Sequence, residues 1–180
     1  AIVWFRKDLR LADHPALDAA LQANKEIIPV FIWDEEEGGN WSPGAASRWW
    51  LHHSLTALNQ ALDGKLIVLS GNPAEILWSL ADAVAAAGLS WNRAYDPWRI
   101  TRDAAIKGQC AARGLVVESH NGSLLWEPWD VLKNDGTPYK VFTPYYRRGC
   151  LAATPPRRPL PVPPNLVIAD GNGFANGKSA

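Results

Sequence analysis

The stretch AIVWFRKDLRLADHPAL, residues 1–17, passes from an apolar segment through a charged loop to the beginning of a helix. Residues 2–5 are β-branched or aromatic, which is typical of a buried strand. The charged residues of the loop are Arg6, Lys7, Asp8 and Arg10. Asp13 stands just before His14 and Pro15, and an acidic cap followed by proline predicts the start of a helix. A strand, a loop and a helix in this order indicate the first half of a βαβ unit, whose ligands bind at the carboxyl end of the strand.

The same alternation of apolar runs and helical patterns continues through the next hundred or so residues. Further strands are expected over residues 27–33, 66–69, 91–95 and 115–118. Two helices are expected to begin at the cap-and-proline pairs of residues 42–43 and 72–73, and Gly88 is expected to end the second of them. This order predicts an α/β fold, a doubly wound, five-stranded parallel sheet of Rossmann-like type with helices on both faces.

Beyond residue 121 the pattern becomes irregular, and a short helix is expected over about residues 144–151. The segment PPRRPLPVPP, residues 155–164, carries six prolines, so it cannot pair within a sheet and is expected to run extended. We therefore expect an α/β domain over residues 1–153 and a proline-rich interdomain linker over residues 154–180. Because the chain starts directly on a strand and ends in NGFANGKSA, we expect it to be a segment of a longer protein.

The 180-residue chain carries 18 basic and 18 acidic residues, so its net charge is zero. A domain that binds a nucleic-acid backbone tightly normally has a basic excess, which argues against tight DNA binding by this segment alone. No apolar run approaches the roughly 18 residues that a membrane span needs, and no secretion signal opens the chain. The two distant cysteines, Cys110 and Cys150, favour reduced, buried thiols in a cytoplasmic protein.

Motifs for several common activities are missing from the sequence. No G-x-G-x-x-G follows the first strand, no G-x-x-x-x-G-K-[ST] occurs, and the G-x-S-x-G elbow of a hydrolase is absent. His52 and His53 are adjacent, so on a helix they point about 100° apart and cannot hold one metal ion together. We therefore assign no catalytic residue and no metal ligand in this segment.

Ten tryptophans in 180 residues are an unusually large number, and two of them follow predicted strands. Trp33 ends the second strand and Trp98 comes after the fourth, so both are expected at the edge of the sheet where ligands bind. A flat conjugated ligand would stack there, with Arg6, Arg48 and Asp96 forming hydrogen bonds to its polar edge. The alternative is that these tryptophans cover the sheet or meet another domain.

A second aromatic and basic cluster, YKVFTPYYRRG, lies at residues 139–149. Its composition suits either a nucleic-acid patch or a docking surface for another domain. Because the proline-rich segment follows immediately, we favour the docking surface. The charged loop at residues 6–10 also has an ordinary alternative, a solvated loop held by a weak local ion pair.

Four segments, in this order along the chain, are similar to those of DNA photolyases and cryptochromes. They are VWFRKDLRLADHPAL at residues 3–17, PGAASRWWLHHSL at 43–55, YDPW at 95–98 and GSLLWEPWDVLKNDGTPYKVFTPYYRR at 122–148. Over residues 1–155 the chain thus resembles the amino-terminal α/β domain of that family.

The resemblance implies the light-harvesting domain of a deoxyribodipyrimidine photolyase, a carbon-carbon lyase in which light-excited reduced FAD splits cyclobutane pyrimidine dimers in DNA. FAD and damaged DNA would bind a separate helical carboxyl-terminal domain, so the segment alone is expected to be inactive. Its partners would be that helical FAD domain and, through it, damaged DNA, in a monomeric protein. Two alternatives stay open: a cryptochrome-like blue-light photoreceptor without repair activity, and a nucleotide-binding domain related to electron-transfer flavoproteins.

The resemblance also implies an antenna pigment in the α/β domain, which passes excitation energy to the flavin. Folate-binding members carry an asparagine and a glutamate where this chain has Trp98 and Arg99. Members that use deazaflavin or FMN contact it through an arginine of the opening motif and an acidic residue after the fourth strand, here Arg6 and Asp96, and Ala94 stands at a second acidic position. The arrangement thus resembles the members that use deazaflavin or FMN more closely, and methenyltetrahydrofolate stays a third candidate pigment. The expected contacts are Arg6, Trp33, Arg48, Asp96 and Trp98.

Overall fold

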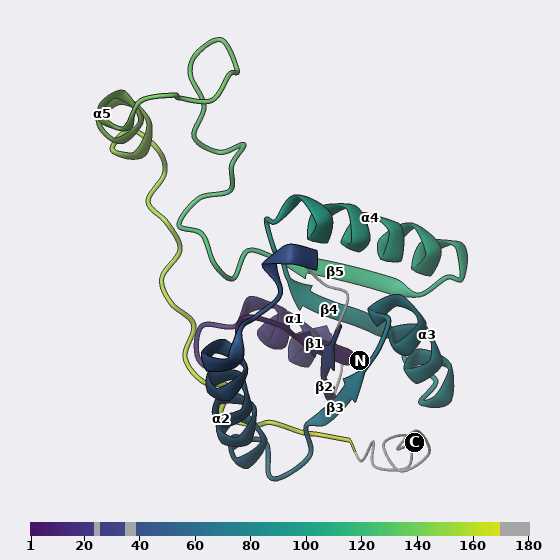
Figure 1. The fold of residues 1–180 in the computed structure, drawn as a ribbon. Coiled ribbons are helices and arrows are strands. Elements are labelled where there is room, and N and C mark those ends of the chain that lie inside the picture. The colour runs from purple at the N-terminus through teal and green to yellow at the C-terminus, as the bar shows by residue number, and fades with distance from the viewer. Residues whose placement is uncertain (24–25, 35–38, 170–180) are drawn as a thin grey trace. The chain divides into compact units, whose positions relative to one another are not determined.

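The computed structural model describes residues 1–23, 26–34 and 39–169 (Figure 1). One compact unit comprises the described residues between Ala1 and Gly122 together with those from Leu160 to Ala169, and Ser123–Pro159 form a second unit. The strands of the first unit are β1 (Ile2–Phe5), β2 (Ile28–Trp33), β3 (Ile67–Ser70), β4 (Gly88–Asn92) and β5 (Val116–His120). Its helices are α1 (Pro15–Ala23), α2 (Ala45–Ala61), α3 (Pro73–Ala83) and α4 (Pro97–Ala112), with a 3-10 turn at Gly39–Trp41.

Within the described residues the strands form one parallel sheet in the order β3-β2-β1-β4-β5. The sheet grows outward from β1, because β2 and β3 lie to one side of it and β4 and β5 lie to the other (Figure 1). In such open sheets, ligands bind beyond the carboxyl end of the strand where the order reverses. The prediction of a doubly wound, five-stranded parallel sheet is confirmed.

Alternate side chains of β1 enter two apolar cores, one on each face of the sheet. Ile2 and Trp4 lie in the core that α3 and α4 cover, whereas Val3 and Phe5 lie in the core that α1 and α2 cover. All four side chains are at most 2% exposed, which explains why the run consists of β-branched and aromatic residues throughout. Burial on both faces fixes the position of β1, and with it the start of the charged loop.

Helix α1 is capped by His14 and not by Asp13, so that prediction is wrong. The Leu17 N–H donates to Nδ1 of His14 at 3.0 Å, which is the bond that a capping side chain makes. Asp13 instead adopts a left-handed conformation with φ of 49°. Its backbone N–H donates to the Leu160 carbonyl at 2.8 Å, and its carboxylate accepts from the Leu160 N–H at 3.1 Å. The aspartate therefore anchors a distant segment of the chain.

The predicted start of α3 is confirmed, whereas the predicted start of α2 is wrong. Asn72 caps α3 as predicted, because its side chain accepts from the N–H groups of Ala74 and Glu75 and Pro73 is the first helical residue. Helix α2 begins later than predicted, with Gly44 at the cap position. The Ser42 hydroxyl donates to the Gly39 carbonyl at 2.7 Å, so it closes the preceding turn and does not cap the helix.

Strand β4 was predicted three residues too late, because Gly88 was taken as the end of a helix. Helix α3 already ends at Ala83, two residues before Ala85, which has φ of 46°, and the Ala86 N–H donates to the Ala81 carbonyl at 2.9 Å. Gly88 is the first residue of β4 and pairs with Val116. The other strands agree with the prediction to within two residues at either end.

The segment that follows the prolines returns to the first unit. Ile27 forms a parallel bridge with Ile168, whereas Leu166 and Ile168 pack against the core under α1 and α2. The Ile27 N–H donates to the Val167 carbonyl at 3.0 Å. Part of the proline-rich stretch is thus fixed to the α/β unit, and the role of residues 154–180 as an interdomain linker stays a prediction.

The second unit, Ser123–Pro159, contains few regular elements. The expected short helix begins earlier than predicted, as α5 (Phe142–Pro144), and continues as a π-helical turn over Tyr145–Cys150. The indole N–H of Trp126 donates to the Thr154 carbonyl at 2.8 Å and so ties the two ends of the unit together. Cys110 in α4 and Cys150 in this unit are free and buried, and burial raises the pKa of the Cys110 thiol.

Candidate functional site

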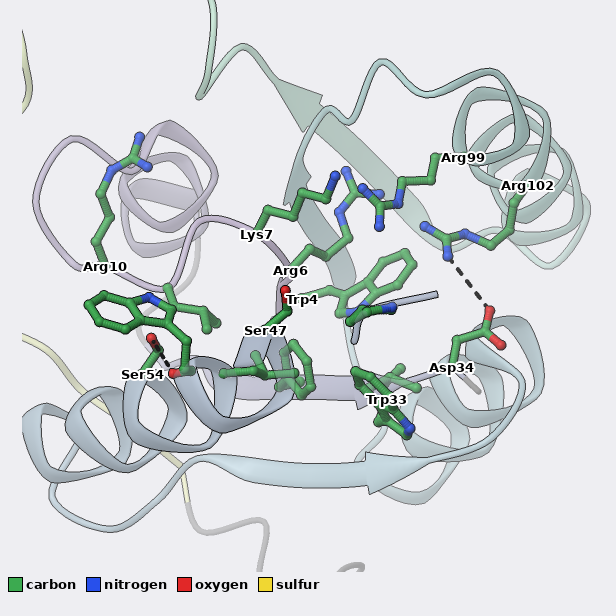
Figure 2. A pocket seen from close by; sticks show the side chains of 16 residues that line it. Trp4, Arg6, Lys7, Arg10, Trp33, Asp34, Ser47, Ser54, Arg99 and Arg102 are labelled. Carbon is green, nitrogen blue, oxygen red and sulfur yellow. Dashed lines mark hydrogen bonds and ion pairs between the residues drawn. The ribbon is translucent and has the colours of Figure 1, made fainter. Parts of the chain in front are cut away.

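A cavity of about 480 Å³ lies at the carboxyl ends of β1 and β2 (Figure 2). Its walls come from the ends of these strands, the loop after β1, and the first turns of α2 and α4. The apolar lining residues are Trp4, Leu9, Phe31, Ile32, Trp33, Pro43, Trp50 and Leu51, and the charged ones are Arg6, Lys7, Arg10, Asp34, Arg99 and Arg102. Ser47 and Ser54 complete the lining. The volume is within the range of small-molecule sites, and three indoles provide flat surfaces for a conjugated ring.

Positive charge dominates the described part of the cavity lining. Five of its side chains are cationic and one, Asp34, is acidic. Asp34 lies 3.9 Å from Nη1 of Arg102, so this carboxylate is already engaged in an ion pair. In Figure 2 the side chains of Arg6, Arg99 and Arg102 extend toward Trp4. A flat ligand with an anionic substituent therefore suits these walls better than a cationic one.

Arg6 is held in place from several sides. Its Nη1 donates to Oδ2 of Asp103 at 2.6 Å, and its Nη2 donates to the Asn92 carbonyl at the end of β4. Its guanidinium carbon also lies 4.9 Å from the ring centroid of Trp4. Burial lowers the pKa of Arg6, and the nearby Asp103 carboxylate only partly offsets this effect. The arginine still carries its charge at neutral pH. Arg6 is thus a fixed positive charge at the end of the central strand.

A buried network around Asp8 holds the loop that carries Arg6. The Asp8 carboxylate accepts from the Arg6 N–H at 2.9 Å and from the Asn92 amide at 2.6 Å, and Nε2 of His14 lies 3.1 Å away. His14 accepts from Leu17 through Nδ1, which leaves Nε2 as the nitrogen that faces the Asp8 carboxylate. Burial alone would raise the pKa of Asp8, but these hydrogen bonds outweigh it and lower the pKa to about 2.

The predicted contact residues divide into two groups. Arg6 and Trp33 line the cavity, and Arg48 stands beside it with its guanidinium carbon 5.8 Å from the Trp33 ring centroid. Asp96 and Trp98 do not line the cavity in the described part of the chain. Asp96 pairs with Arg99 at 2.6 Å and with Lys7 at 3.6 Å, so it holds two cations of the lining from behind. Contact of any of the five with a pigment stays a prediction.

The lining residues that sequence reasoning missed include Trp4, Trp50, Arg99 and Arg102. Arg99 and Arg102 are three residues apart near the start of α4, so they share one helix face at the ligand-binding edge of the sheet. That spacing was visible in the sequence. Trp4 was taken only as strand core, since nothing in the sequence indicates that its ring ends at a cavity.

The aromatic cluster of the second unit exposes several large side chains. Phe142 and Tyr146 stack with ring centroids 5.8 Å apart and are 73% and 46% exposed. Lys140 and Arg148 line a shallow cavity beside Tyr139. These residues suit the docking surface that we favour, and that role stays a prediction.

Two other kinds of site were searched for among the described residues. No helix there is both long and apolar enough to cross a membrane. The same residues contain no group of three or more histidine, cysteine, aspartate or glutamate side chains arranged to hold a metal ion. The cavity at the carboxyl ends of β1 and β2 is therefore the candidate functional site.

Comparison with known proteins identifies the family of this chain. The family model for DNA photolyase matches residues 1–164. A deoxyribodipyrimidine photo-lyase of Agrobacterium fabrum is 41% identical over 169 residues, which cover 92% of this chain and 34% of that protein. Cryptochrome-1 of Arabidopsis thaliana is 38% identical over 173 residues, which cover 94% of this chain and 25% of that protein.

A solved structure gives the same result for the fold. The crystal structure of a class III photolyase from Agrobacterium tumefaciens matches with a TM-score of 0.85 and 40% identity, and the match covers 93% of this chain and 35% of that one. The chain thus spans roughly a quarter to a third of the relatives that it matches. With the family model, the sequence identities and the fold in agreement, this chain belongs to the DNA photolyase family.

Proposed function

We propose that this chain is the light-harvesting domain of a deoxyribodipyrimidine photolyase, a light-driven, FAD-dependent enzyme that repairs cyclobutane pyrimidine dimers in DNA. The observation that carries the proposal is the cavity walled by indoles and arginines at the carboxyl end of β1. Its position is the one where open α/β sheets bind ligands. In this proposal FAD and DNA bind parts of the protein outside this chain, which agrees with the chain's zero net charge.

The cavity residues fit an antenna pigment of the deazaflavin, FMN or methenyltetrahydrofolate type. Trp33 and Trp50 offer flat apolar surfaces on which a conjugated ring would stack, and Arg99 and Arg102 would oppose an anionic substituent. A bound pigment would absorb near-ultraviolet or blue light and pass the excitation energy to the flavin. The protein's own contribution is to orient the ring and to exclude water from it.

In this proposal Asp96 and Arg48 act indirectly, by holding residues of the cavity lining in position. Asp96 orients Arg99 and Lys7 through its two ion pairs. Arg48 packs over Trp33 and donates from Nε to the Pro43 carbonyl at 2.9 Å, which steadies the start of α2. Trp98, which is 43% exposed, would reach a pigment only at the outer edge of the site.

A cryptochrome-like photoreceptor is the second candidate function. The 38% identity with Cryptochrome-1 of Arabidopsis thaliana is close to the identity with the Agrobacterium photolyase, so both classes are near relatives. The match to the DNA photolyase family favours either of them over a relative of electron-transfer flavoproteins.

Light-dependent repair by the full-length protein that contains this chain separates the two functions. The protein is reduced, mixed with DNA that carries cyclobutane dimers, and illuminated with blue light, with a dark sample as the control. We expect the dimers to disappear only in the light. Absence of repair by reduced, FAD-loaded protein would favour the photoreceptor.

A further inference from the structure

Trp4 forms part of the cavity wall and has two guanidinium groups beside its ring. The guanidinium carbons of Arg6 and Arg102 each lie 4.9 Å from the Trp4 ring centroid. Trp4 is 2% exposed, and its indole N–H has no hydrogen-bond partner within the part of the chain that the structure describes. The indole is thus kept dry and close to two fixed positive charges (Figure 2).

Two carboxylates anchor these cations, Asp103 from outside the cavity lining and Asp34 from within it. Asp103 accepts from Arg6 at 2.6 Å and from Nη2 of Arg102 at 3.2 Å, yet it is not one of the residues that line the cavity. Asp34 lies 3.9 Å from Arg102. One carboxylate is shared by two guanidinium groups, and both of these groups pack on the indole. Because Coulomb energy falls with distance, these two cations, 4.9 Å from the ring centroid, raise the electrostatic potential at the Trp4 ring.

An indole beside a light-excited conjugated ring is a potential quencher of that ring. One electron leaves the indole for the excited ring and then returns, so no bond changes and the excitation energy is lost as heat. Positive charge next to the indole opposes the first step, because the oxidised indole is itself a cation. The favourable attraction between the guanidinium groups and the neutral ring is lost in the same step. The Trp4 N–H also opposes oxidation of the indole, because no described group accepts the proton that an oxidised indole would release.

We propose that Arg6 and Arg102 make Trp4 a poor electron donor and so preserve the excited state of a pigment in the cavity. This inference rests on the light-harvesting function proposed above. Trp33 has a similar arrangement, with Arg48 over its ring. The two arginines beside Trp4 thereby have an effect that is separate from binding the pigment.

The test uses FMN as the probe and measures its affinity by calorimetry and its fluorescence lifetime. Trp50 is 69% exposed, and every protein compared carries Trp50→Phe so that quenching by this rim indole does not mask the effect of Trp4. Arg102→Gln removes one cation from Trp4, and Arg102→Lys retains it. Arg113→Gln is the matched control, because it removes a guanidinium group that packs on another indole, 5.2 Å from the Trp78 ring centroid, and neither residue lines the cavity.

We expect Arg102→Gln to shorten the lifetime of bound FMN by about twofold, whereas Arg102→Lys and Arg113→Gln leave it close to that of the parent. Adding Trp4→Phe to Arg102→Gln should restore the lifetime. An unchanged lifetime in Arg102→Gln with FMN still bound would overturn this inference and leave the proposed function standing. If the chain with Trp50 intact binds neither FMN, deazaflavin nor methenyltetrahydrofolate, the proposed function fails and the inference fails with it.

Discussion

At the scale of single residues, the charged side chains of the loop after β1 have two different roles. Asp8 is buried, accepts two hydrogen bonds and lies 3.1 Å from Nε2 of His14, so it holds the loop to β4 and to the start of α1. Arg6 stands at the edge of the cavity and is held by Asp103, a residue 97 positions away in the sequence. The sequence placed Arg6 at a ligand site but gave no indication of this partner, because a contact over such a separation depends on the tertiary fold.

Replacement of Asp8 by asparagine tests the role of the buried network. The Asp8→Asn amide lacks the negative charge and has one acceptor oxygen fewer for the Arg6 N–H and the Asn92 amide, so we expect the free energy of unfolding at pH 7 to fall by about 2 kcal/mol. Since the folded pKa of about 2 lies below the ordinary value of 3.8, the carboxylate stabilises the fold above pH 4. That contribution is lost as the pH falls toward 2. Denaturant unfolding at pH 7 and pH 3 measures both effects.

The control for Asp8→Asn is Asp82→Asn, since the Asp82 side chain is 78% exposed and lies 3.9 Å from Arg113. This control should change stability little at either pH. Equal losses in the two variants would show that burial of Asp8 has no special importance for stability.

Replacement of Trp50 by alanine tests the proposed stacking surface. Trp50 and Trp49 are neighbours on α2 and are similarly exposed, at 69% and 62%, but only Trp50 lines the cavity. We expect Trp50→Ala to weaken FMN binding about tenfold and Trp49→Ala to leave it nearly unchanged. Calorimetry on both variants makes the comparison, and an equal effect in the two would argue against stacking at this wall.

At the scale of the elements, composition and capping patterns predicted much of the fold. The apolar run of β1 and the Asn72–Pro73 start of α3 were correct, because each depends on local chemistry. The end of α3 was wrong because Ala85 adopts the left-handed conformation that glycine usually provides. The predicted cap of α1 was wrong because the Asp13 carboxylate accepts a hydrogen bond from the N–H of Leu160, a residue far along the chain.

Replacement of the Asn72 cap should weaken α3 without affecting the cavity. Asn72→Ala removes the acceptor for the N–H groups of Ala74 and Glu75, so we expect a loss of about 1 kcal/mol in the free energy of unfolding. Asn72→Asp retains an acceptor and should lose less. Because Asn72 does not line the cavity, the FMN affinity of both variants should equal that of the parent, and calorimetry checks this point. A stability loss as large in Asn72→Asp would contradict the capping role.

At the scale of the whole molecule, the family match places this chain within larger relatives, of which it spans a third or less. In the proposed division of labour this chain captures light, and bond cleavage takes place on FAD elsewhere in the protein. The sequence led to this proposal because four separate segments resemble the family in the right order. The cavity lining was harder to predict, because it combines side chains from β1, β2, α2 and α4 that only the folded sheet brings together.

The isolated 180-residue chain should therefore show no repair activity. We expect no light-dependent loss of cyclobutane dimers when this chain is supplied with reduced FAD and illuminated, while the full-length protein is active in the same assay. Chromatographic counting of the remaining dimers measures both. Repair by the isolated chain would contradict the assignment of catalysis to another part of the protein.

The central claim, that the cavity holds a light-harvesting pigment, is tested most directly by purifying the full-length protein from the cells that make it and analysing its chromophores. The measurement is the absorption spectrum, followed by extraction and identification of the bound pigments. The account predicts a second near-ultraviolet or blue-absorbing pigment beside FAD, whose absorption band also excites flavin emission. Protein that is saturated with FAD and carries no other chromophore would contradict it.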